Sequence, residues 1–145
     1  MRTVTAAILA VAIFLAGALA GTAVSAQRRP ADPQCGTATA QVRTTLYFGL
    51  SKAHTKGSVS ELEWQMFLKD EVTSRFPDGL TSWEAEGQWR SADGVIGHER
   101  SKVLLLVHSD TPAARTSVQT VIERYRKSFD QESVLWETAR VCAAA

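Results

Sequence analysis

The segment 80-LTSWEAEGQWRSADGVIGHERSKVLLLVH-108 is the most informative about the fold, because it encodes two strands joined by a tight turn. Residues 80–90 and 95–108 alternate polar and apolar side chains and are rich in β-forming residues. Between them, residues 91–94 end in Gly94, and glycine suits the left-handed position of a three-residue hairpin loop with a bulge. The stretch therefore predicts a β-hairpin.

The charges of this hairpin favour one register. The turn pairs residues whose numbers sum to 186, which sets Glu86 opposite Arg100 and Glu84 opposite Lys102. A register summing to 185 would oppose Glu86 to Glu99, and like charges directly opposite each other are unfavourable. Charge pattern and turn chemistry thus predict the same pairing. The other expected pairs are Gln88 with His98 and Trp83 with Val103.

Before the hairpin, the sequence predicts a strand and then a helix. Residues 43–50 alternate and are rich in β-formers, which indicates a strand. Ser60 and Glu63 have the spacing of a capping box, and Val59 is placed to pack on the following helix as a hydrophobic staple. Pro77-Asp78-Gly79 ends that helix. Its apolar stripe comprises Trp64, Phe67, Leu68, Val72 and Phe76.

After the hairpin come a second helix and a last strand. Thr111 and Pro112 are an N-cap residue and a proline at the first helical position, and residues 131–142 read as a strand. The helix stripe comprises Val118, Val121, Ile122, Tyr125 and Phe129. The order β-α-β-β-α-β predicts an α+β, ferredoxin-like sandwich, with a four-stranded antiparallel sheet in strand order 4-1-3-2 and both helices on one face.

The two cysteines test this topology. In the predicted strand order the last strand lies beside the first, so Cys35 and Cys142 come near each other at one end of the sheet. We expect a Cys35–Cys142 disulfide in an oxidising compartment, where such a link stabilises by roughly 2–4 kcal/mol. The alternative is two unpaired thiols near the termini.

The first residues have the parts of a secretory signal peptide. Residues 1–26 contain a basic start, an apolar core and small residues at the expected cleavage site after Ala26. The alternative, a transmembrane anchor, is disfavoured because Gly17 and Gly21 interrupt the apolar stretch. We expect an exported protein, periplasmic or secreted, with a flexible leader at 27–40, a single domain at 41–145 and no stable membrane anchor after cleavage.

Composition excludes several classes of function. The chain has 145 residues and a net charge of +1, so it lacks the basic excess that binding to nucleic acid requires. His54, His98 and His108 lie on different elements without metal-ligand spacing, and two cysteines are too few for a four-cysteine site. No nucleophile elbow or phosphate-binding glycine loop is present. We therefore expect no metal, no cofactor and no catalytic constellation.

One face of the hairpin is the candidate site. Alternation puts His98 and Arg100 on the same face as Glu86, and this face extends along Leu104 and Leu106. We expect it to be the helix-free face, binding a small ligand or a second subunit. The alternative is a solvated face of cross-strand ion pairs, each worth under about 1 kcal/mol.

Aromatic residues supply two further candidates. Tyr47 joins the site if the first strand turns that side outward, and Trp89 near the hairpin tip suits a partner contact. Trp64 and Trp83 are expected in the core instead. Trp136 is compatible with core or edge.

Several segments together resemble one bacterial family. They are residues 43–50 (RTTLYFGL), 75–81 (RFPDGLT), 87–90 (GQWR), 99–106 (ERSKVLLL) and 131–135 (QESVL). The chain is similar over residues 41–142 to the exported family catalogued as domain of unknown function 3574, whose members are described as secreted proteins or lipoproteins. This chain lacks the lipobox cysteine, which favours a soluble exported form. The resemblance implies export and the fold, and it implies no catalytic residues.

Two hypotheses follow for function. The first is a non-enzymatic binding or interaction module that uses the open sheet face, on which self-association as a homodimer is a further possibility. The second is a small enzyme of the ferredoxin-like dimeric type, acting on a small organic substrate. A clustered polar pocket would favour the enzyme, whereas a flat salt-bridged face would favour binding.

Overall fold

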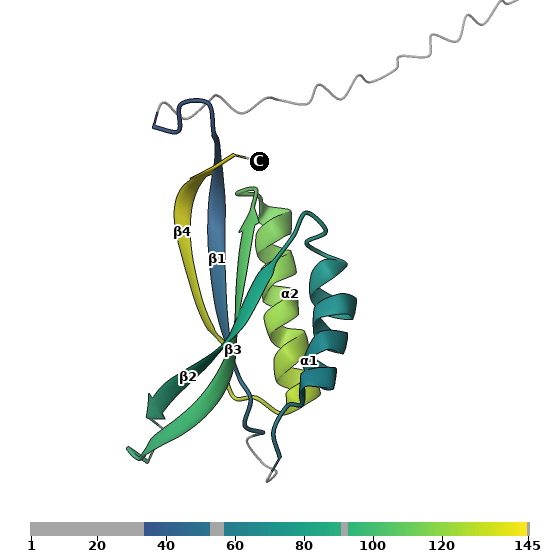
Figure 1. Ribbon diagram of the computed structural model, residues 1–145, viewed down its shortest axis with the longest axis vertical. Coiled ribbons are helices and arrows are strands. Elements are labelled where there is room, and N and C mark those ends of the chain that lie inside the picture. Colours follow the sequence, from purple (N-terminus) through teal and green to yellow (C-terminus); the bar gives the residue numbers. More distant parts are fainter. Residues whose placement is uncertain (1–33, 53–56, 91–92, 145) are drawn as a thin grey trace, which may run out of the picture.

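The computed structural model describes residues 34–52, 57–90 and 93–144, apart from the side chain of Trp89. The elements are β1 (Thr39–Gly49), α1 (Glu61–Phe67), the π-helical segment η1 (Leu68–Thr73), β2 (Thr81–Arg90), β3 (Ile96–His108), α2 (Pro112–Phe129) and β4 (Leu135–Ala143). They form a four-stranded antiparallel sheet in the order β2-β3-β1-β4, with the helices on one face (Figure 1). The predicted fold and strand order are confirmed. The expected signal peptide lies outside the described residues.

The hairpin has the predicted register. Gly94 has a φ of +84°, as the expected turn requires. The Cα partners across β2 and β3 are Glu84 with Lys102, Glu86 with Arg100, Gln88 with His98, and Arg90 with Ile96. Charge pairing and turn chemistry thus determined the register correctly.

The core lies between the sheet and the helices. Leu46 and Phe48 of β1 and Leu104 and Leu106 of β3 are at most 1% exposed. They pack against the predicted helix stripes, of which Trp64, Phe67, Leu68, Val72, Phe76, Val118, Val121, Tyr125 and Phe129 are buried. Trp136 of β4 packs at the margin of this core and is partly buried.

Both helix starts are built as the sequence predicts. Ser60 Oγ accepts a hydrogen bond from Glu63 N at 3.3 Å, and Glu63 Oε2 accepts one from Ser60 N at 2.7 Å, which completes the capping box. Thr111 Oγ1 accepts from Ala114 N at 3.1 Å, and a proline follows at the first helical position. After Phe67 the first helix continues as the π-helical segment, which keeps its apolar residues on the buried side.

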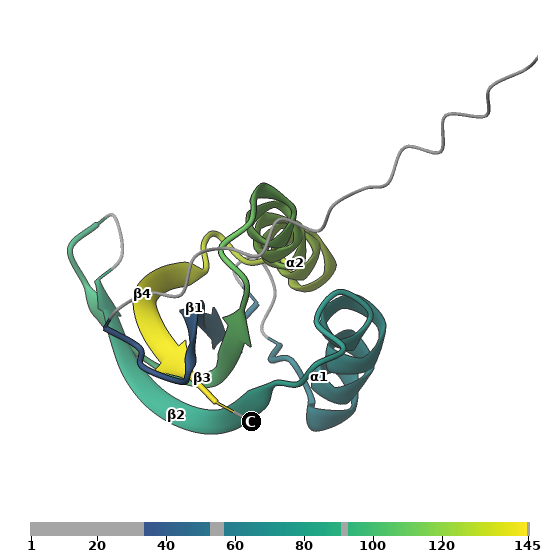
Figure 2. The same cartoon turned by 90° about the horizontal axis from the view of Figure 1, so that it is seen from above.

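The helix-free face is concave. Seen from above, β2 sweeps around the side of the sheet that β1 and β4 occupy (Figure 2). Because of this curvature, Thr45 and Val103, whose side chains point away from the helices, are only 6% and 1% exposed. The open face is therefore a hollow.

The structure corrects the expected face of the hairpin. Leu104 and Leu106 are buried under the helices, and strand alternation carries Arg100 and His98 to the same side. This side is the helix-bearing one, so the expectation that it is helix-free is wrong. The physical reason is that two buried leucines outweigh an exposed charged strip in deciding which way a strand faces. Trp83, expected in the core, lies on the open face and is 44% exposed.

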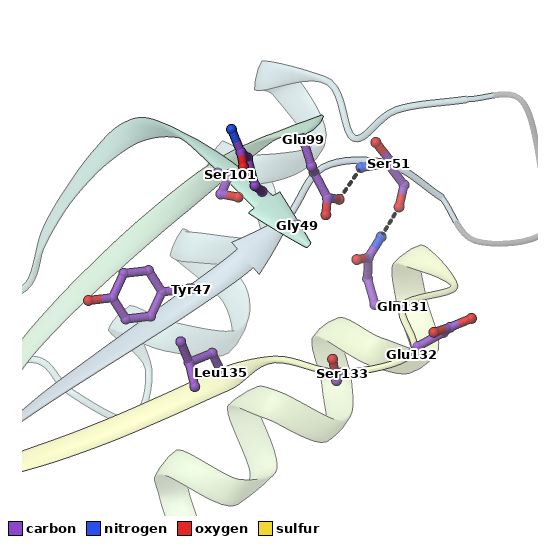
Figure 3. A pocket seen from close by; sticks show the side chains of 11 residues that line it. Tyr47, Gly49, Ser51, Glu99, Ser101, Gln131, Glu132, Ser133 and Leu135 are labelled. Carbon is purple, nitrogen blue, oxygen red and sulfur yellow. Dashed lines mark hydrogen bonds between the residues drawn. The ribbon is translucent and has the colours of Figure 1, made fainter. Parts of the chain in front are cut away.

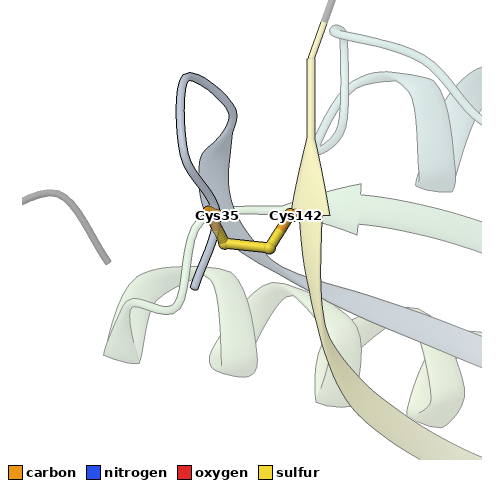
Figure 4. Close-up of a disulfide and its surroundings, with 2 residues drawn as sticks. All are labelled: Cys35 and Cys142. Atoms are coloured by element: carbon orange, nitrogen blue, oxygen red, sulfur yellow. A yellow bond between two sulfur atoms is a disulfide. The ribbon is translucent and has the colours of Figure 1, made fainter. Parts of the chain in front are cut away.

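A disulfide links the ends of the domain. Cys35 and Cys142 are bonded, with a Cα–Cα distance of 5.2 Å (Figure 4). Cys142 lies in β4, opposite Ala40 of β1, so the link fastens the edge strand to the residues that precede the sheet. The strand β1 begins at Thr39, within the range expected to be leader. Among the described residues, no helix is long and apolar enough to cross a membrane.

Candidate functional site

A pocket of about 430 Å³ occupies the concave open face, at the end of the sheet where β1 leads into Ser51 (Figure 3). All four strands and the turn between α2 and β4 contribute to it. Gly87 of β2 and Leu135 of β4 both line it, although these two strands are at opposite edges of the sheet, because the curvature brings the edges together. The lining residues are Tyr47, Gly49, Ser51, Gly87, Gln88, Glu99, Ser101, Gln131, Glu132, Ser133 and Leu135.

One wall of the pocket is a network around the end of β1. Glu99 Oε1 accepts a hydrogen bond from Ser51 N at 3.0 Å. Gln131 Nε2 donates to Ser51 O at 2.6 Å and to Phe129 O at 3.3 Å, which ties the α2–β4 turn to β1 (Figure 3). Three segments far apart in sequence are thereby held at fixed positions.

Gly49 makes room for the Glu99 carboxylate. A Cβ atom at position 49 would lie 2.4 Å from Glu99 Oε1 and 2.8 Å from its Cδ, closer than real Cβ contacts allow. A side chain at this position would therefore displace the Glu99 carboxylate, although the backbone angles of Gly49 do not themselves call for glycine. By contrast, a Cβ atom on Gly87 would meet its nearest atoms at 3.9 Å, an ordinary contact.

The opposite wall is aromatic and apolar. The Tyr47 ring and the Leu135 side chain lie side by side there (Figure 3), and Leu135 is 62% exposed. Tyr47 Oη donates a hydrogen bond to Glu137 Oε1 at 3.2 Å. Burial raises the pKa of the Tyr47 hydroxyl, and the Glu137 carboxylate raises it further. The pocket thus has one polar and one apolar side.

Below the pocket, a buried tyrosine supports β1. Tyr125 Oη of α2 donates to Gly49 O at 2.8 Å, so the helix layer fixes the strand end from behind. Burial raises the pKa of Tyr125, so this hydroxyl stays protonated and a donor at ordinary pH.

The charged residues predicted for the site form a separate group on the helix side of the hairpin. Arg100 pairs with Glu84, although its Cα partner is Glu86. Lys102 Nζ bridges Glu61 Oε2 of α1 at 2.7 Å and Glu84 Oε2 at 3.3 Å. Hydrogen bonds from Lys102 and Arg100 hold the pKa values of the Glu61 and Glu84 carboxyls, respectively, below the usual range. This cluster joins the hairpin to α1.

Of the predicted site residues whose side chains the structure describes, only Tyr47 lines the pocket. Glu86, His98 and Arg100 are exposed on the helix side of the hairpin. The backbone of Trp89 pairs with Gly97, and its side chain is outside the described residues.

The sequence reasoning missed Glu99, Ser101, Gln131 and Glu132. A signal for the first two exists, because strand alternation from the buried Leu104 places Ser101 and Glu99 on the open side.

A second hollow, of about 410 Å³, lies on the helix side between β1, β4 and the start of α2. His108 lines it, but its ring nitrogens already contact Thr44 Oγ1 and Ser109 O, each at 2.9 Å. Across the described residues, no three acidic, histidine or cysteine side chains cluster as metal ligands would. His54 lies outside those residues.

Comparison with known proteins identifies the family and supports the fold. Residues 43–144 match the family described as "Protein of unknown function (DUF3574)", and the chain belongs to this family. No curated protein matches the chain.

Two solved structures similar to the chain are of a phage SAM lyase. The complex with S-methyl-5'-thioadenosine has a TM-score of 0.52 at 17% identity, covering 71% of this chain and 90% of that one. The apo state has a TM-score of 0.52 at 16% identity, covering 72% and 90%. CutA from Synechococcus elongatus, complexed with Bis-Tris, has a TM-score of 0.49 at 13% identity, covering 74% and 87%. At these identities the likeness concerns the fold alone.

Proposed function

We propose that this member of the family is a binding module that takes a small organic molecule into the pocket on its open sheet face. The observation that carries the proposal is the convergence of all four strands and the α2–β4 turn on one hollow. Ligand sites are concave, largely pre-formed and lined by apolar groups with a few fixed polar ones. The Tyr47 and Leu135 wall supplies the first kind of group, and Glu99 with Gln131 supplies the second.

The size of the pocket supports a small ligand. About 430 Å³ lies within the range of roughly 300–1,000 Å³ that is usual for small-molecule sites. The hydrogen bonds of Glu99 and Gln131 to the Ser51 backbone fix the polar wall before any ligand arrives, which lowers the entropy cost of binding.

Export belongs to the same proposal. The signal-like residues 1–26 and the disulfide both suit an oxidising compartment outside the cytoplasm. Mass spectrometry of the exported chain should find an N-terminus at Gln27 and no free thiol. A chain recovered with residues 1–26 attached and reduced cysteines would contradict export.

Nuclear magnetic resonance tests the binding function. We expect that titrating the ¹⁵N-labelled protein with a set of small amines, carboxylates and neutral alcohols shifts the backbone amides of Ser51, Ser101 and Ser133 with at least one compound. Shifts confined to the helix layer, or none from any compound, would contradict the proposal. Ligand-free shifts that depend on protein concentration and centre on Trp83 and Leu135 would assign this face to homodimerisation instead.

A small enzyme is the second candidate, because the pocket holds a clustered set of polar side chains. Glu99 would serve as a general base and the Tyr47 hydroxyl as a proton donor. Because a phage SAM lyase has a similar fold, S-adenosylmethionine is the first substrate to test. Chromatography should then show S-methyl-5'-thioadenosine formed by the wild type and not by Glu99→Gln. No product above the protein-free control would exclude this substrate.

A further inference from the structure

We infer that the pocket selects a small organic cation, such as a quaternary ammonium, and that the Glu99 carboxylate is its anchor. This inference rests on the proposed function and names the ligand class of the same site. It depends on how Glu99 is held, on the charges around it and on the wall that faces it.

The absence of a side chain at Gly49 allows the Glu99 carboxylate to approach the end of β1. The carboxylate lies so close over Gly49 that a Cβ atom there would be 2.4 Å from Oε1. Ser51 N donates to that same oxygen at 3.0 Å. No described residue donates to the second oxygen, Oε2. One oxygen therefore holds the carboxylate in place and the other is left to meet a ligand.

The charge of the lining is negative. Glu99 and Glu132 are its two carboxylates, and the described lining contains no lysine or arginine. The basic residues nearest in sequence are engaged elsewhere: Lys52 Nζ binds Glu63 Oε1 at 3.0 Å, and Arg100 and Lys102 bind carboxylates on the helix side of the sheet. A cation in the pocket thus meets a carboxylate with which no described basic side chain forms an ion pair, whereas an anion is repelled.

The wall opposite Glu99 suits the rest of such a ligand. The Tyr47 ring can contact a quaternary ammonium through its face, and the adjacent Leu135 covers methyl groups. A primary amine with an apolar body meets the same two surfaces. A carboxylate on one side and an aromatic ring on the other are complementary to a cation that also carries apolar surface.

Choline and its uncharged carbon isostere, 3,3-dimethyl-1-butanol, test this inference directly. The two probes have nearly the same shape and differ in charge, so the ratio of their Kd values isolates the charge effect. By NMR titration of the pocket amides, we expect choline to bind about tenfold more tightly than the alcohol. In Glu99→Gln, which keeps the size of the side chain, we expect most of this preference to be lost, with a small part remaining from the Tyr47 ring and Glu132.

Gly49→Ala and Gly87→Ala form a matched pair at the same pocket. The Cβ atom at position 49 must displace the Glu99 carboxylate, whereas the one at position 87 meets its nearest neighbours at 3.9 Å. We expect Gly49→Ala to lose the tenfold preference for choline and Gly87→Ala to keep it. Thermal unfolding and the amide spectrum of each variant establish that it is folded.

Three outcomes would overturn the inference. They are equal Kd values for the two probes in the wild type, an unchanged choline preference in Glu99→Gln, and an equal loss of preference in both glycine variants. If the alcohol or a carboxylate shifts the pocket amides while choline does not, the cation class is wrong but the pocket is still a binding site. If no compound shifts them, the proposed function fails as well.

Discussion

Among single residues, two tryptophans that the sequence predicts in the core have different environments. Trp64 is 1% exposed in the aromatic core, where its ring centroid lies 5.4 Å from that of Phe48. Trp83 is 44% exposed on the open face. The burial of a tryptophan therefore depends on which face of its helix or strand it occupies, and not on the residue type alone.

Truncation of these two tryptophans should therefore cost very different amounts. We expect Trp64→Ala to lower the free energy of unfolding by about 3–5 kcal/mol through cavity formation. We expect Trp83→Ala to lower it by about 1 kcal/mol or less, because much of its surface is already in water. Urea denaturation measures both values. Equal losses would contradict the face assigned to the hairpin.

The sequence correctly predicted which residues pair across the hairpin. It did not predict which face of the hairpin the helices cover. The register follows from local charge and turn chemistry, both of which are readable in residues 80–108. Orientation depends on which side of the strands the helices cover, a tertiary property. The buried Leu104 and Leu106 hold the decisive signal, since alternation from them leads to Ser101 and Glu99 on the open side. Gln131 and Glu132 lie in a turn, where no such periodicity exists.

At the scale of elements, the start of α1 is stabilised by its capping box. The Ser60 backbone N–H and then its hydroxyl hold the pKa of Glu63 at about 2, with a further contribution from Lys52. Because this pKa is depressed in the folded state, the stabilisation is present above the usual pKa of a glutamate. It is lost as the pH falls through the folded value of about 2.

Removing the Ser60 hydroxyl tests the cap. We expect Ser60→Ala to cost about 1 kcal/mol of stability at neutral pH. We also expect the pKa of Glu63 to rise, yet to stay below the usual value, because the backbone N–H of residue 60 and Lys52 remain. Carbon-detected NMR titration of the carboxyl group follows the pKa. An unchanged pKa would show that the hydroxyl has no part in the cap.

The hairpin and α1 are joined through Lys102. Hydrogen bonding to Glu61 raises the pKa of Lys102, with Glu84 adding to the effect. Because the pKa of Lys102 is raised in the folded protein, these ion pairs stabilise the fold fully below the pKa of an unfolded lysine, about 10.4. The stabilisation is lost as the pH rises through the pKa of Lys102 in the folded protein.

The variant Lys102→Met measures the contribution of the Lys102 ion pairs to stability. We expect the wild type to lose more stability than Lys102→Met between about pH 10 and pH 12, measured by urea unfolding. Lys127→Met, at an exposed position of α2, is the control and should follow the wild type. If all three proteins have the same pH dependence, the bridge between hairpin and helix contributes nothing.

At the scale of the whole molecule, the disulfide closes nearly the full length of the domain. Cys35 and Cys142 are separated by 107 residues in sequence, so the link restricts the unfolded chain strongly. We expect reduction, or Cys35→Ser with Cys142→Ser, to lower the free energy of unfolding by about 2–4 kcal/mol. Denaturation with and without dithiothreitol measures the difference, and an unchanged midpoint would contradict it.

The whole fold was more predictable than the site. Caps, stripes, turns and the cysteine pair are local or topological signals, and each leads to the same β-α-β-β-α-β arrangement. The pocket depends on curvature that brings Gly87 of β2 and Leu135 of β4 to one hollow. Sheet curvature arises from the packing of all strands together. No pattern in the chain specifies it, which is why Tyr47 lines the pocket while Glu86, His98 and Arg100 lie on the helix side of the hairpin.

A substitution that fills the pocket tests whether the open sheet face is the binding site. Ser101 lines it from β3, so Ser101→Trp places an indole in the hollow, whereas Ser74→Trp places one on an exposed position after η1. By calorimetric titration with choline, we predict that Ser74→Trp binds with the Kd of the wild type and Ser101→Trp binds at least about tenfold more weakly. Choline binding by Ser101→Trp with an unchanged Kd would contradict the assignment of the open-face pocket as the binding site.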